Sequence, residues 1–237
     1  MIKAIFFDLD GTLLPMDNEE FTKGYFKLLV KKLMPLGYDG ERLVSSIWAG
    51  TAAMVKNDGS RSNYDAFWET FAAIEGERVY KDMPVFDEFY ANEFNGAQAL
   101  CGRSEELIAL VNEIKERGLR VILATNPLFP AVATENRIRW AGLEPEDFEL
   151  YTTYENISYC KPNVDYYREL LRRTGLEGSE CLMIGNDADE DTPAQETGME
   201  VFLLTDHLIN KHGRDLSSWP HGSIEELRGF IFDRTHF

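Results

Sequence analysis

The stretch KAIFFDLDGTLLPMD, residues 3–17, decides how the rest of the chain is read. Its apolar first half has the composition and length of a buried β-strand. The strand ends in two aspartates one residue apart, Asp8 and Asp10, followed at once by Gly11 and Thr12. Burying a carboxylate is costly unless a cation or hydrogen bonds replace the lost water. We therefore expect a positively charged group at the end of this strand.

Short apolar runs of this kind recur along the chain, and helical patterns separate them. The runs are residues 2–8, 119–125, 148–152, 181–185 and 201–205. They lack the clean alternation of half-exposed strands, which predicts parallel strands covered on both faces. Between the runs, Ser104 is a candidate helix cap, Pro130 suits the first turn of a helix, and Pro162 is expected to begin another. Strands that alternate with helices predict an α/β fold with a doubly wound parallel sheet.

The segment 15–97 breaks this alternation. Aromatic residues and leucines recur through it at helical spacing, and no strand is evident. We predict an all-helical module inserted directly after the first strand, whereas residues 1–14 and 98–237 form the α/β core. The aromatic stripes of the module are interpreted as its own core rather than as a ligand site, because such residues are usually buried.

Composition narrows the classes of partner. Asp and Glu total 41 against 24 Lys and Arg, so the formal net charge is -17 and nucleic acid is not an expected partner. No segment approaches the roughly 18 apolar residues of a membrane helix, and no signal peptide is evident. The three cysteines form neither a disulfide framework nor a zinc motif, which fits a reducing compartment. We expect a cytoplasmic protein without membrane attachment, either a monomer or a small homo-oligomer.

Polar residues follow three of the predicted strands. These residues are Asp8 and Asp10 after the first strand, Thr125 and Asn126 after the second, and Asp187 and Asp191 after the strand at 181–185. In an open parallel sheet, ligands bind beyond the carboxyl ends of the strands, so these side chains should meet at one edge. Lys161, in YCKPN, precedes a predicted helix and is expected on the same side.

Such a collection of carboxylates repels itself unless a hard cation lies among them. Mg²⁺ takes one or two carboxylates and keeps its other positions for water and phosphate oxygens. A lysine and a hydroxyl nearby suit a phosphoryl group, whose charge spreads over three oxygens during transfer. One aspartate is then placed to attack phosphorus, and a second to supply and remove protons. These residue types favour magnesium-dependent phosphoryl transfer.

The same residues resemble the four motifs of the haloacid dehalogenase superfamily phosphatases. DLDGT is similar to the first motif, the threonine of ILATN to the second, Lys161 of CKP to the third, and IGNDADED to the fourth. The motifs occur in the family's order across the whole α/β part. The helical module stands where this family carries its first type of cap. The resemblance implies a phosphatase that acts on a small phosphorylated metabolite.

The resemblance also implies roles for the first motif. Asp8 would be the nucleophile and would bind magnesium through its other carboxylate oxygen. Asp10 would act as general acid and then as base, with its backbone carbonyl on the metal. Thr12 would support Asp10 and belongs to the expected substrate-binding set. Dehalogenases of the superfamily attack carbon and typically lack the second aspartate, so Asp10 favours cleavage of a phosphate ester.

The other motifs would bind the phosphate and complete the metal site. Thr125 and the backbone amide of Asn126 would hold the phosphoryl oxygens, and Lys161 would balance the charge of the phosphate and the nucleophile. Asp187 and Asp191 would complete the metal-binding set, and Asp191 would orient either Lys161 or a metal-bound water.

The sequence leaves several assignments open. Asn186 stands where many relatives place an acidic residue, and the assignment among Asp187, Asp189 and Asp191 is not decided. A sugar phosphomutase would keep both paired aspartates, and a non-catalytic protein that binds a phosphorylated ligand would keep the fold. Substrate choice is expected to depend on side chains of the helical module, with Trp48, Lys56 and Tyr64 as candidates. The four histidines, one of them His236, are expected in surface or tail positions.

Overall fold

A six-stranded sheet organises the α/β part of the computed structural model, which describes residues 1–235. Its strands are β1 (Ala4–Phe7), β2 (Arg120–Leu123), β3 (Leu150–Tyr151), β4 (Cys181–Gly185), β5 (Glu200–Leu204) and β6 (His221–Gly222). They lie in the order β3-β2-β1-β4-β5-β6, and every neighbouring pair is parallel. All of the strands therefore end at the same edge of the sheet, with β1 between β2 and β4.

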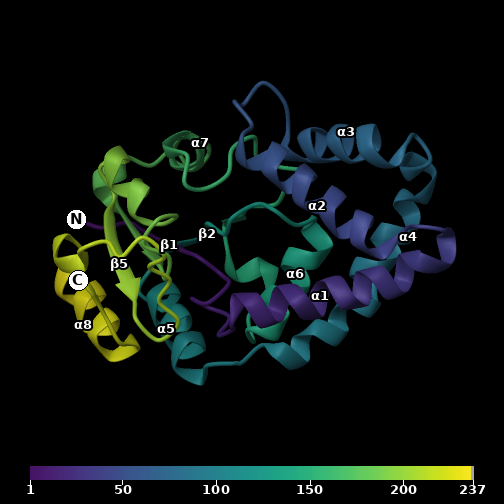
Figure 1. The fold of residues 1–237 in the computed structure, drawn as a ribbon. Helices are drawn as coiled ribbons and strands as arrows, with labels where there is room; N and C mark the ends of the chain where they lie inside the picture. The colour runs from purple at the N-terminus through teal and green to yellow at the C-terminus, as the bar shows by residue number, and fades with distance from the viewer. Residues whose placement is uncertain (236–237) are drawn as a thin grey trace.

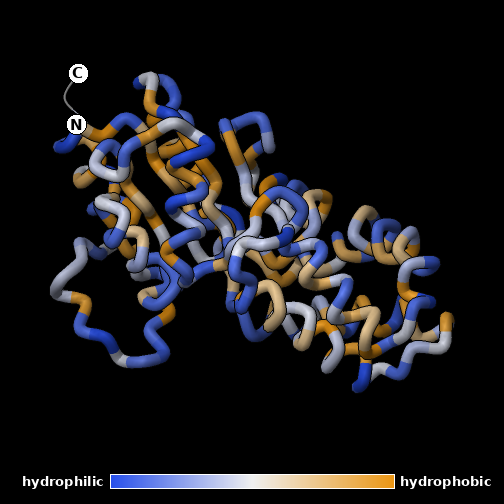
Figure 2. Tube along the Cα trace, turned by 90° about the horizontal axis from the view of Figure 1, so that it is seen from above, coloured by the Kyte–Doolittle hydropathy of each residue, from blue (hydrophilic) through white to orange (hydrophobic). Residues whose placement is uncertain are grey.

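Alternate residues of the strands face two apolar layers. Ile5 and Phe7 lie in one layer with α5 (Glu105–Glu116) and α8 (Ile224–Arg234), whereas Ala4 and Phe6 lie in the other with α7 (Val164–Thr174). Figure 1 shows α5 and α8 close together on one side and α7 on the other. The hydrophobic colour in Figure 2 concentrates on the strands between these layers. The predicted doubly wound α/β fold is confirmed.

Local capping explains where the helices of this part begin. Ser104 accepts a hydrogen bond from the Leu107 amide and caps α5, as predicted. The prediction that Pro162 begins α7 is wrong, because the side chain of Asn163 accepts from the Asp165 amide and caps a helix that starts after it. The sequence reading also missed β6, since two residues are too few to make an apolar run.

Four helices separate β1 from α5 in the chain. They are α1 (Asn18–Leu33), α2 (Gly40–Val55), α3 (Asn63–Glu75) and α4 (Val79–Ala91), followed by the 3₁₀ segment Glu93–Leu100. The two connections lie side by side: Met16 forms an isolated antiparallel bridge with Cys101, and the Gly102 amide donates to the Pro15 carbonyl at 2.6 Å. The helical content of this segment matches the prediction, while its division from the core at residues 15 and 97 stays a prediction.

The helical module packs on the α/β part through a continuous apolar core. The α6 helix (Ala131–Trp140) contributes Ala133 and Ile138 to the same cluster as Phe89 and Phe94 of the module. Hydrogen bonds cross the same junction, for example from Asn136 Nδ2 to the Tyr90 carbonyl at 2.9 Å. Within residues 1–235, no helix is both long and apolar enough to cross a membrane. The predicted position of His236 lies outside the described residues.

Candidate active site

A fully buried lysine joins two of the expected aspartates. Lys161 Nζ lies 2.9 Å from Asp8 Oδ1 and 2.7 Å from Asp191 Oδ1. Asp8 follows β1 directly, Asp191 lies in the loop after β4, and Lys161 comes from the segment before α7. The Lys161 side chain is 0% exposed and that of Asp191 is 1% exposed, whereas 11% of Asp8 reaches solvent. The positively charged group expected at the end of the first strand is thus Lys161.

Burial and mutual charge shift the pKa values of this cluster. Burial is the main cause that raises the pKa of Asp8; Lys161 opposes it, the charges of Asp191 and Asp10 add to it, and the net value is about 7. For Lys161, burial opposes the charge, but the carboxylates of Asp191 and Asp8 outweigh it and hold its pKa well above the ordinary value. Burial also raises the pKa of Asp187. The site is therefore short of positive charge.

The loop after β4 uses both carboxylate oxygens of Asp191 within the protein. One oxygen accepts from Lys161, and Oδ2 accepts from the Asp187 amide at 2.9 Å. The close approach needs a glycine, because a Cβ at Gly185 would lie 2.0 Å from Asp191 Oδ2. Of the two roles that were left open for Asp191, this geometry favours the orientation of Lys161. Asp189 points instead to His212 and Arg214 near the surface.

The turn after Asp10 places Thr12 against Asn186. Gly11 has a φ of +81°, which favours glycine, and a Cβ there would lie 2.2 Å from Asn186 Nδ2. The Thr12 side chain is buried, and its hydroxyl donates to Asn186 Oδ1 at 3.1 Å. The support of Asp10 by Thr12 stays a prediction, since the hydrogen bond of the Thr12 hydroxyl goes to Asn186. Thr12 thus fixes Asn186, the residue that departs from the family pattern.

Thr125 and Asn126 lie beside the lysine, as expected from the end of β2. The Asn126 side chain accepts from the Lys161 amide at 3.2 Å and donates to Glu190 Oε2 at 3.0 Å. The Thr125 carbonyl accepts from two hydroxyls, one of them that of Tyr166 at 2.8 Å. These contacts hold the loop in place, and Thr125 and Asn126 line the same cavity as Asp8.

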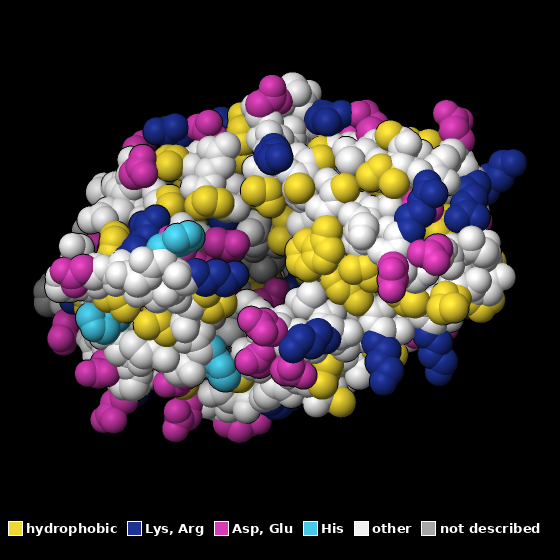
Figure 3. Space-filling view, viewed as in Figure 1, with side chains coloured by type: hydrophobic (Ala, Val, Ile, Leu, Met, Phe, Trp, Pro, Cys, Tyr) yellow, Lys and Arg dark blue, Asp and Glu magenta, His cyan; other side chains and the backbone are white. Residues whose placement is uncertain are grey.

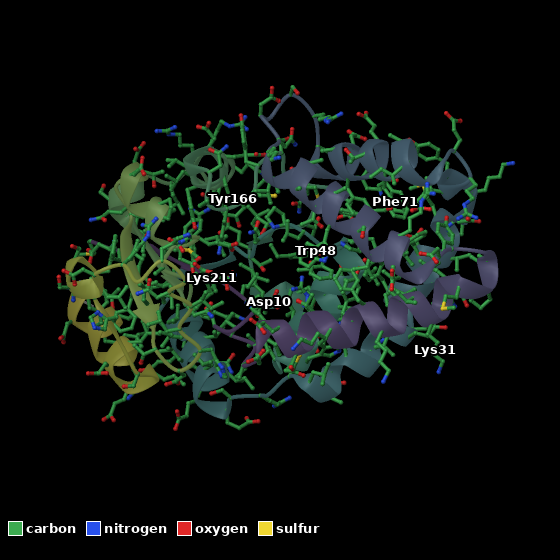
Figure 4. All side chains as sticks on the ribbon, in the orientation of Figure 1. Asp10, Lys31, Trp48, Phe71, Tyr166 and Lys211 are labelled. Atoms are coloured by element: carbon green, nitrogen blue, oxygen red, sulfur yellow. The ribbon has the colours of Figure 1, made fainter. Side chains whose placement is uncertain are left out.

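A cavity of about 190 Å³ opens in front of Asp8. Among the residues that line it are Asp8, Asp10, Thr125, Asn126 and Asp187, whereas Lys161 and Asp191 lie behind Asp8. Figure 3 shows the hollow between the α/β part and the helical module. In Figure 4, Asp10 lies between Lys211 and Trp48, which come from opposite sides of that hollow. The structure brings the expected residues together at one edge of the sheet.

Sequence reasoning missed three features of this site. Arg137 of α6 is fully buried, forms an ion pair with Asp10 Oδ2 and lies over the ring of Phe129. Glu190 lines the cavity, and burial raises its pKa to about 8. The loop after β5 lies against the fourth motif, where the Ile209 amide donates to the Asn186 carbonyl, and its Lys211 lines the cavity. The sequence held one signal for Arg137, because this arginine lies on the apolar face of α6 with Ile138.

The carboxylates that face the cavity fit Mg²⁺. Burial raises the pKa of both Asp8 and Asp187, so a cation between them would relieve both, and Asp10 Oδ1 is a further buried acceptor there without a hydrogen-bond partner. Within residues 1–235, no three acidic, histidine or cysteine side chains form a closed cage for a metal. Mg²⁺ does not need one, because it keeps several waters and takes few carboxylates.

An α/β sheet with a lysine–aspartate cluster at the carboxyl ends of its strands defines a hydrolase-like site on a doubly wound fold. Residues 2–196 match the family model of the haloacid dehalogenase-like hydrolases, and the chain belongs to that family. It is 26% identical over 232 residues, covering 96% of each chain, to a glyceraldehyde 3-phosphate phosphatase of Methanocaldococcus jannaschii. It is 28% identical to a phosphoglycolate phosphatase of Pectobacterium atrosepticum, covering 86% of this chain and 80% of the relative.

Solved structures share the fold. A 2-haloacid dehalogenase from Pseudomonas syringae superposes with a TM-score of 0.66 at 19% identity, and covers 99% of this chain and 100% of its own. At this identity the likeness concerns the fold alone, so the chemistry has to be argued from the residues of the site.

Proposed function

We propose that this chain is a magnesium-dependent phosphatase that hydrolyses small phosphomonoesters through an aspartyl phosphate on Asp8. One observation carries the proposal: Asp8 lies at the wall of the cavity with Lys161 bound to one carboxylate oxygen at 2.9 Å. The other oxygen is then available to attack phosphorus. The names of the curated relatives, which are phosphatases for small phosphorylated compounds, support the same reaction class.

Each step uses a residue at the cavity. Asp8 attacks phosphorus while the bond from phosphorus to the ester oxygen breaks, and Asp10 gives that oxygen a proton. Asp10 then takes a proton from water, which attacks the aspartyl phosphate and releases inorganic phosphate and the free Asp8 carboxylate. The Thr125 hydroxyl and the Asn126 amide hold phosphoryl oxygens throughout, and Asp191 keeps Lys161 in place beside Asp8.

The metal site would be formed by the carboxylates of Asp8 and Asp187 and by the backbone carbonyl of Asp10. Mg²⁺ bound there would neutralise the phosphoryl charge and the like charges of the aspartates. We assign Asp191 to Lys161 rather than to the metal, because both of its oxygens already accept hydrogen bonds from the protein. Asp10 separates this chemistry from that of dehalogenases, which attack carbon and need no acid for the leaving group.

The helical module would act as a cap. Asn18, Phe21 and Thr22 of α1 line the cavity opposite the aspartates, so substrate enters between the module and the sheet edge. The module is connected to the core at 14–17 and 95–102, where Met16 and Cys101 are paired. A movement at these two connections would exclude bulk water during phosphoryl transfer and release the products afterwards.

The test is release of inorganic phosphate from 4-nitrophenyl phosphate and from a panel of phosphorylated metabolites. We expect turnover with Mg²⁺ that is lost in excess chelator and lost in Asp8→Asn. A matched control is Asp165→Asn, because Asp165 is an exposed aspartate of α7 that pairs with Arg168. Full turnover in Asp8→Asn would refute the mechanism. Isomerised sugar phosphate without free phosphate would indicate a mutase instead.

A further inference from the structure

A second cavity, of about 130 Å³, lies between the helical module and the core, next to the first. Its walls come from α1, α2, α3, α4, the loop at 128–130 and Tyr154, and aromatic rings form most of them, including Tyr25, Trp48 and Trp68. Among the described residues that line this cavity, none carries a charge. The aromatic residues interpreted from the sequence as module core thus leave an apolar space at the end that faces the active site.

Four of the polar side chains in this wall are paired with one another, and the Thr22 hydroxyl donates to the Asn18 carbonyl. The hydroxyls of Tyr25 and Tyr90 lie 2.9 Å apart, and Trp68 Nε1 donates to the Tyr154 hydroxyl at 3.3 Å. Burial raises the pKa of both Tyr25 and Tyr90, so these phenols are neutral at neutral pH. With these groups paired, most of the surface that the wall presents is carbon.

The two cavities adjoin. Leu128 and Phe129 line both of them, and so does Thr22 of α1. The same loop begins at Asn126, beside the expected phosphate position, and reaches Pro130 in the apolar cavity. A molecule whose phosphate lies at Asp8 therefore has an apolar space within reach of its other end. Trp48, 51% exposed, lines this space.

We propose that the second cavity is a subsite for an apolar group of the substrate, which makes the preferred substrates phosphomonoesters of alcohols that carry one ring or about five to six carbons. A buried apolar cavity of roughly 150 Å³ is known to accept benzene, which sets this size. The inference rests on the proposed function, because the phosphate must be anchored at Asp8. It separates this chain from an enzyme for small polar phosphates alone.

A series of n-alkyl phosphates from methyl to octyl, with phenyl phosphate beside them, tests the inference. Burial of each methylene is worth about 0.8 kcal/mol, or about a 4-fold gain in kcat/KM. We expect kcat/KM to rise by on the order of 10²-fold from methyl to pentyl phosphate and to stop rising beyond about six carbons. Equal values along the series would overturn the subsite while leaving the phosphatase intact. If no ester in the series releases phosphate, the proposed function itself fails.

Filling the cavity gives a second, independent result. Thr51 of α2 lines only the apolar cavity, so Thr51→Phe should lower the ratio of kcat/KM for pentyl over methyl phosphate by at least about 10-fold. Ile74→Phe adds the same ring at an exposed position of α3 and should keep the ratio. Binding of pentylphosphonate and methylphosphonate to Asp8→Asn, measured by calorimetry, reports the same preference without turnover. A ratio that Thr51→Phe leaves unchanged would contradict the proposal.

Discussion

Replacement of Asp191 by asparagine should weaken the fold through Lys161. The pair is completely buried, with Nζ and Oδ1 2.7 Å apart, and Lys161 would retain only Asp8 as a charged partner. Removing one member of a buried ion pair typically costs about 3–5 kcal/mol, and the amide keeps one neutral acceptor. We expect Asp191→Asn to lower the free energy of unfolding by about 3 kcal/mol, and Lys161→Met to lower it by about 3–5 kcal/mol.

A double-mutant cycle isolates the interaction itself. The double variant should lose about 2 kcal/mol less than the two single variants lose together, because a charge-assisted hydrogen bond contributes roughly 1.5–3 kcal/mol. Urea unfolding in chelator at a pH near 7.5 measures each value without a bound metal. The exposed pair Asp165–Arg168 provides a control cycle, whose coupling should not exceed about 0.5 kcal/mol. Additivity within about 0.5 kcal/mol for Lys161 and Asp191 would show that the buried pair does not stabilise the fold.

Two further predictions concern the aspartates of the first motif. Because burial raises the pKa of Asp8 to about 7, this acid is protonated below that pH, and kcat/KM at low Mg²⁺ should fall about 10-fold per pH unit below 7. Saturating Mg²⁺ should move this acid limb of the pH profile to lower pH. Initial rates at two Mg²⁺ concentrations test this, and acid limbs at the same pH would contradict it. Arg137→Met removes the buried partner of Asp10 and should lower kcat by about 10- to 10²-fold with little change in KM, as steady-state kinetics would report. An unchanged kcat in the folded variant would show that Arg137 does not position Asp10.

The parallel sheet and the meeting of the motifs were predictable from local patterns, whereas the order of the strands was not predicted. Asp8, Asp187 and the Thr125–Asn126 pair each follow an apolar run directly, and parallel strands end at one edge, so their proximity follows from topology alone. The cap of α5 at Ser104 was readable for a similar reason, because the side chain bonds to a backbone amide three residues away.

The contacts that the sequence did not predict depend on tertiary structure. Thr12 bonds to Asn186, which lies 174 residues further along the chain, and Arg137 contacts Asp10 from α6, the helix between β2 and β3. The sequence left the role of Asp191 open between the metal and Lys161, because both roles require an acidic residue and only the tertiary contacts distinguish them. The apolar cavity shares this limit, because aromatic residues at helical spacing look alike whether they fill a core or surround a space.

Whether Asp8 is the nucleophile is tested most directly by quenching the enzyme during turnover and locating the phosphoryl group by mass spectrometry. We expect an acid-stable, base-labile phosphoryl group on the peptide that contains Asp8, formed with Mg²⁺ and absent from Asp8→Asn. Steady turnover with no phosphorylated enzyme, or a phosphoryl group on another residue, would contradict it.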